Sequence, residues 1–205
     1  VDACFIVSRN GAQVGFALVE VKLAETGFGT CRGAKPTDKN GSGNPGSNRC
    51  KDIGQVRHSP ETQCWMVTKH GRRYWEWLAD TEWFELDHVP YIDGCPFRDG
   101  VYQLMRKAVL ARALMVEAGA EWAEVAVCVH AGNHAAHQLK YPVAGAIDAV
   151  DAARSIAPKA GFQPLSPSAI VSAIEASDAS YSEWARWMRS RYDLEPDSGE
   201  TIVKS

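Results

Sequence analysis

The sequence VGFALVEVK at residues 14–22 follows DACFIVS at residues 2–8, and both stretches have the composition of β-strands. The Asn10–Gly11 pair between them is a strong signal for a β-hairpin. Because alternate side chains of a strand share a face, Glu20 and Lys22 point to the same side of the predicted sheet. The two stretches therefore predict a hairpin with a charged pair near the end of its second strand.

The position of Asp2 relative to Glu20 depends on the length of the hairpin loop. A two-residue loop would place Asp2 opposite Val19, whereas a loop with an odd number of residues would place it opposite Glu20. We expect the odd loop, because its register gives one apolar face that ends at Asp2, Glu20 and Lys22. That face would consist of even-numbered residues, namely Cys4, Ile6, Val14, Phe16 and Leu18.

Two carboxylates that lie close together repel each other, and a hard divalent cation such as Mg²⁺ would relieve this repulsion. Mg²⁺ typically takes one or two carboxylates and keeps several waters. Such an ion polarises a phosphoryl oxygen and lowers the pKa of a bound water, while Lys22 could orient that water or stabilise negative charge. The alternative is a solvated ion pair on an exposed strand. The apolar residues that flank Glu20 and Lys22 favour a site over a wet surface.

The pattern Asp2-x17-Glu20-Val21-Lys22 resembles the core of the PD-(D/E)XK nuclease superfamily, and GFALVEVKLAE resembles a branch with Glu-x-Lys-x-x-Glu. The resemblance implies a restriction-endonuclease-like fold in which Asp2 and Glu20 bind Mg²⁺ or Mn²⁺ and Lys22 assists the hydrolysis of DNA. It implies a weaker role for Glu25. Members of this superfamily usually have a helix before the Asp strand. This sequence opens directly on the strand, so either a segment precedes it or the site is less complete.

Length and charge limit the classes of function. The 205 residues suit one domain with a sizeable core, and the net charge of −3 gives no overall basic character. A nucleic-acid partner would therefore bind a local basic patch. We find no membrane-spanning apolar run and no signal peptide, so we expect a cytoplasmic protein without a membrane partner. DNA is the expected partner, and the oligomeric state is left open.

The six cysteines fall into two groups. Cys4 and Cys128 lie in predicted strands and are expected to be small buried hydrophobes. The other four lie in a loop-rich insertion at residues 26–99, namely Cys31, Cys50, Cys64 and Cys95. In a reducing compartment they could bind zinc or a [4Fe–4S] cluster, and free or disulfide-bonded cysteines are the alternative. Their spacing is not that of a zinc ribbon, and their order does not match the iron–sulfur nucleases of the RecB-like kind.

Two further segments could contact a substrate. Residues 65–93 interleave Lys69, His70, Arg72 and Arg73 with aromatic residues, which could hold phosphates and stack bases. The alternative is that the aromatic residues pack in the core and the basic ones are solvated. Residues 100–118 are expected to form a helix with Gln103 and Arg106 on one face, either directed at the site or simply exposed. RecB-like nucleases resemble this chain in having such a Gln-bearing helix.

Together these features predict an α/β protein with a mixed central β-sheet flanked by helices and a Cys-bearing insertion. The Asp2 and Glu20 strands are expected at the centre of the sheet. The strand at residues 124–130 would follow the helix in a parallel crossover. Further helices are expected at residues 143–157, 166–176 and 181–192. The predicted activity is Mg²⁺-dependent cleavage of DNA. The alternatives are a non-cleaving nucleic-acid-binding protein of this fold and a structural module held by a Cys₄ metal.

Overall fold

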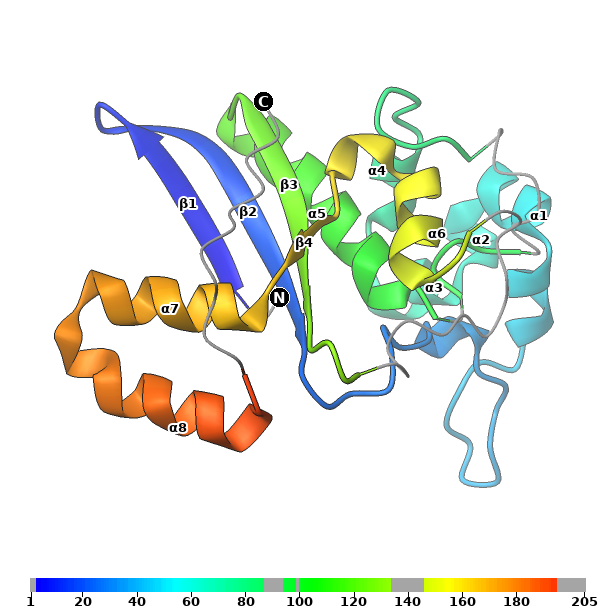
Figure 1. The fold of residues 1–205 in the computed structure, drawn as a ribbon. Helices are drawn as coiled ribbons and strands as arrows, with labels where there is room; N and C mark the ends of the chain where they lie inside the picture. The colour runs from blue at the N-terminus through cyan, green and yellow to red at the C-terminus, as the bar shows by residue number, and fades with distance from the viewer. Residues whose placement is uncertain (1–2, 87–93, 99, 134–145, 195–205) are drawn as a thin grey trace.

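The computed structural model describes residues 3–86, 94–98, 100–133 and 146–194. Within them, four strands form one mixed sheet in the order β1-β2-β3-β4 (Figure 1). Strand β1 (Ala3–Arg9) pairs antiparallel with β2 (Ala12–Lys22). Strands β3 (Trp122–Val129) and β4 (Gln163–Leu165) continue the sheet in parallel. This is the mixed α/β architecture that the sequence predicted.

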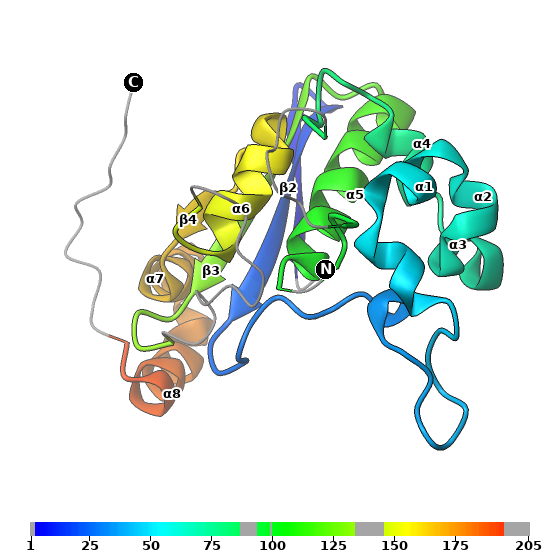
Figure 2. The same cartoon turned by 90° about the vertical axis from the view of Figure 1, so that its right-hand side faces the viewer.

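Helices cover both faces of the sheet (Figures 1 and 2). Helix α5 (Tyr102–Ala118) packs on β2 and β3 on the face that carries Phe16 and Leu18, and α6 (Ala149–Ile156) joins the same core. Helix α7 (Pro167–Ser177) reaches the opposite face, and it packs against α8 (Ser182–Tyr192). The short helices η4 (Pro158–Ala160) and η5 (Ala179–Tyr181) precede β4 and α8.

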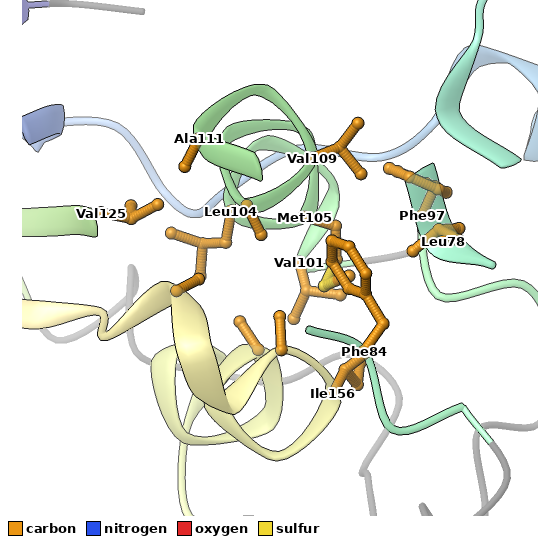
Figure 3. Close-up of a cluster of buried hydrophobic side chains, with 14 of the residues drawn as sticks. Leu78, Phe84, Phe97, Val101, Leu104, Met105, Val109, Ala111, Val125 and Ile156 are labelled. Atoms are coloured by element: carbon orange, nitrogen blue, oxygen red, sulfur yellow. The ribbon is translucent and has the colours of Figure 1, made fainter. Parts of the chain in front are cut away.

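The insertion contains only short helices in its described residues. They are η1 (Arg32–Ala34), η2 (Ser47–Lys51), α1 (Ile53–His58), α2 (Pro60–Gln63), α3 (Trp65–His70) and α4 (Tyr74–Leu78). The insertion shares one hydrophobic core with the sheet and α5. Figure 3 shows that core, in which Leu78 and Phe97 of the insertion approach Val101, Met105 and Val109. The insertion is therefore packed onto the α5 side of the sheet.

The far end of the hairpin has the expected register, but the loop does not have the expected length. Its loop is the two-residue Asn10–Gly11 turn, with positive φ at both residues as a type I′ turn requires, so the expected odd loop is wrong. A β-bulge then leaves Val14 as an extra residue, because Ser8 pairs with Gln13 and Val7 pairs with Gly15. Beyond the bulge, Cys4 lies opposite Leu18 and Ala3 lies opposite Val19. Asp2 lies outside the described residues.

Strand β1 is an edge strand, and its expected place at the centre of the sheet is wrong. The centre is formed by β2 and β3. Because β2 is its only partner among the described residues, β1 is exposed over most of its length, and Phe5 and Ile6 keep 54% and 61% of their surface. Cys4 is exposed as well, contrary to the expectation of burial. The apolar composition of β1 did not reveal that this strand would lie at the edge of the sheet formed by the described strands.

Candidate active site

The site is built around one buried carboxylate. Glu20 of β2 is 2% exposed, and it lies between two lysines that are each 3% exposed, Lys22 of the same strand and Lys107 of α5. Lys22 Nζ lies 2.6 Å from Glu20 Oε1, and Lys107 Nζ forms an ion pair with Glu20 Oε2. Glu20 and Lys22 lie on the same face of β2 as expected, and they form a buried ion pair to which Lys107 adds a second cation from the helix.

Local structure explains why these charges are buried. Glu20 and Lys22 continue the face of β2 that carries Phe16 and Leu18, and α5 packs over this face. Lys107 lies on the buried side of α5, three residues after Leu104 and four before Ala111, both fully buried. The helix therefore brings its lysine onto the carboxylate of the strand it covers.

The three groups carry a net positive charge. One carboxylate faces two ammonium groups, and Glu25 Oε1 lies 3.9 Å from Lys22 Nζ. Glu25 is 61% exposed at its side chain, so solvent screens most of its effect. An uncompensated charge is costly to bury, and its field favours a second anion at the site. A further carboxylate or a phosphate group has the charge that this arrangement lacks.

One oxygen of Glu20 accepts no hydrogen bond from the described residues. This is Oε1, which is in ion-pair contact with Lys22 Nζ at 2.6 Å. Among the described residues, no three His, Cys, Asp or Glu side chains converge to hold an ion. Mg²⁺ needs only one or two protein carboxylates beside waters and substrate oxygens. Glu20 therefore fits the first of these ligands.

A pocket of about 380 Å³ opens above Glu20. Its wall combines α5 with the connection between α3 and α4, where Gly71 adopts φ 60° and ends α3. Four cationic side chains line this pocket against the single carboxylate of Glu20, namely Arg72, Arg73, Arg106 and Lys107. Tyr74, Trp77 and Gln103 are also in the lining. The chain as a whole is acidic, so the excess of cationic side chains is local to this pocket, although Arg73 also pairs with the exposed Glu76 at 2.6 Å.

The predicted secondary residues occupy different places in this arrangement. Gln103 and Arg106 line the pocket, and the Gln103 backbone N–H donates to the Phe28 carbonyl at 2.8 Å. Arg106 is exposed, with its guanidinium 5.3 Å from the centre of the Tyr102 ring. The sequence predictions missed the role of Lys107. A signal existed, because a lysine within the apolar stripe of a helix needs a buried partner.

The four cysteines of the insertion are buried in the shared core, and none of them forms a disulfide. Burial raises the pKa of the Cys31 thiol to about 11 and that of Cys95 well above its ordinary value. Cys128 of β3 is buried as expected, and burial raises its pKa to about 11. No cysteine is among the described residues that line the pocket at Glu20.

Comparison with known proteins gives one match. A family model described as "Restriction Endonuclease associating with ARP" matches residues 1–193. No curated protein and no solved structure matches the chain significantly. In the described part of the chain, every helix is too short or too polar to cross a membrane.

Proposed function

The chain belongs to the family of restriction endonucleases associating with ARP, and from this premise we propose that it is a metal-dependent nuclease that hydrolyses DNA phosphodiester bonds. The observation that carries the proposal is the position of Glu20. This carboxylate lies between two buried lysines and lines a pocket rich in cationic side chains. The same arrangement would neutralise the charge of a phosphodiester.

Mg²⁺ or Mn²⁺ would bind Glu20 through Oε1, and Asp2 is proposed as the second carboxylate. The pairing of Ala3 with Val19 supports this, because it is the register that the Asp2 hypothesis requires. When bound, the ion would polarise a phosphoryl oxygen and lower the pKa of a bound water. Glu25 lies near Lys22 at the solvent-exposed side of the site. It is proposed only as a carboxylate that partly offsets the positive charge of Lys22.

The two lysines would have distinct tasks. Lys22 would orient the attacking water, because it lies beside the oxygen of Glu20 that is proposed to bind the ion. Lys107 holds the other carboxylate oxygen, lines the pocket and would stabilise the negative charge that develops on the phosphate. Both groups are fixed by the strand and helix that carry them, so little rearrangement would be needed during the reaction.

The rest of the pocket would position the substrate. Arg72, Arg73 and Arg106 would contact phosphates, and Trp77 would offer a face for stacking with a base. The ring of Tyr74 already stacks on Phe97, with their centroids 4.6 Å apart. Gln103 is proposed to hydrogen-bond the nucleotide next to the scissile bond. A non-cleaving nucleic-acid-binding protein would use the same surface, so binding alone does not establish the proposal.

A cleavage assay tests the proposal. We expect linear and circular DNA to be cut in the presence of Mg²⁺ or Mn²⁺ and not in EDTA. Glu20→Gln should lose cleavage, whereas Glu121→Gln, which alters only the exposed pair with Arg9, should keep it. Binding of DNA without any metal-dependent cleavage would support the non-cleaving alternative, and full activity of Glu20→Gln would refute the site.

A further inference from the structure

Four buried thiols in the insertion are not used by the proposed nuclease site. They come from four separate segments, with Cys31 just before η1, Cys50 within η2, Cys64 just before α3 and Cys95 after Gly94. Their exposed fractions are 5%, 6%, 8% and 6%, although the chain between them is largely polar. Four thiols from distant parts of a loop-rich segment thus share one buried region.

Backbone contacts tie these segments together. The Cys95 N–H donates to the Cys50 carbonyl at 2.8 Å, and the Cys31 N–H donates to the Phe97 carbonyl at 3.2 Å. The Cys50 thiol reaches the Gly33 carbonyl at 3.4 Å, and a Cβ added to Gly33 would lie 3.6 Å from Cys31 Sγ. The same Cβ would lie 3.6 Å from Cβ of Trp65, the residue that follows Cys64. The four cysteines therefore form one cluster.

From this cluster we infer that Cys31, Cys50, Cys64 and Cys95 together ligate one iron–sulfur cluster that fastens the insertion to the core. A single zinc ion needs its thiolates to converge at about 2.3 Å from one point. Among the described residues no three potential ligands converge in this way. In a [4Fe–4S] cluster each thiolate binds a different iron, so the sulfurs lie farther apart.

The architecture of the insertion gives the cluster a structural purpose. Helices α1 to α4 have four to six residues each, too few to be stable alone. Cys31 and Cys95 lie toward the two ends of the insertion, so ligation of all four thiols would close it as one unit. This would also fix Arg72 and Arg73 in the wall of the pocket.

The full chain, purified anaerobically, provides the test. We expect visible absorbance and about four iron and four acid-labile sulfide per chain. Cys31→Ser and Cys64→Ser should lose most of the iron, whereas Cys4→Ser and the buried control Cys128→Ser should keep it. Stoichiometric zinc in place of iron, or no metal in the wild-type chain, would overturn the inference. The iron and sulfide content of the wild-type chain tests the inference even if a variant fails to fold. This content does not depend on whether the chain cleaves DNA.

Discussion

Lys107 and Glu20 form a buried ion pair that joins helix α5 to strand β2. The second oxygen of Glu20 faces Lys22, so one carboxylate is shared by two cations. Glu20 therefore has a structural task beside its proposed chemical one. A loss of activity in its variants must be separated from a loss of stability.

Replacing Glu20 with Gln should lower the stability of the fold. The change leaves two buried ammonium groups without a carboxylate, and breaking a buried pair in this way costs about 3–5 kcal/mol. The free energy of unfolding in urea measures the effect. Glu121→Gln breaks the exposed Arg9–Glu121 pair and should cost no more than about 1 kcal/mol. Equal stability of the two variants would show that the Glu20 network is not desolvated.

Replacing Lys107 with Met should slow cleavage without lowering the stability of the fold. The apolar side chain removes the excess buried cation and leaves the Glu20–Lys22 pair, so the free energy of unfolding should stay level or rise. The cleavage rate should fall about 10²–10³-fold if Lys107 stabilises the developing charge. Lys159→Met on the surface provides the control. A variant with unchanged cleavage would limit Lys107 to a packing role.

Replacing Arg72 and Arg73 together with Ala should weaken DNA binding and reduce its dependence on salt. Both residues are exposed, line the pocket and lie on the insertion, so their removal should leave the core intact. The slope of log affinity against log salt should become shallower by about one for each phosphate that the protein no longer neutralises. Arg186→Ala with Arg191→Ala on α8 removes the same charge outside the pocket. Equal weakening in both double variants would indicate a general effect of charge.

Local patterns in the sequence predicted the hairpin, helix α5 and the shared face of Glu20 and Lys22. The bulge at Val14 was not predicted, because it arises from two competing demands. Asn10–Gly11 favours a two-residue turn, while burial of Phe16 and Leu18 fixes the pairing beyond it. Only a bulge meets both demands. The turn signal alone would have given the wrong register.

Non-local relationships could not be predicted in the same way. Strand β1 has the composition of a central strand, yet its edge position depends on which strands the rest of the chain supplies. The ion pair of Lys107 with Glu20 joins a helix to a strand that is far from it in the sequence. The sequence of the helix alone could not identify Glu20 as the partner of Lys107. The nearness of the four cysteines likewise depends on how the insertion folds.

Replacing Cys128 with Ala should change how stability depends on alkaline pH. Burial raises the pKa of the Cys128 thiol from 9.0 to about 11. Between these values the unfolded chain releases a proton that the folded chain keeps, so the free energy of unfolding falls as the pH rises through this range. The wild-type chain should therefore lose stability more steeply than Cys128→Ala when urea unfolding is followed between pH 8.5 and 11. Every other titrating group is common to both proteins, so its contribution cancels in the difference.

The control is Cys4→Ala, which removes an exposed thiol and should follow the wild-type slope. Parallel curves for all three proteins would show that the Cys128 thiol titrates in the folded chain as it does in the unfolded one.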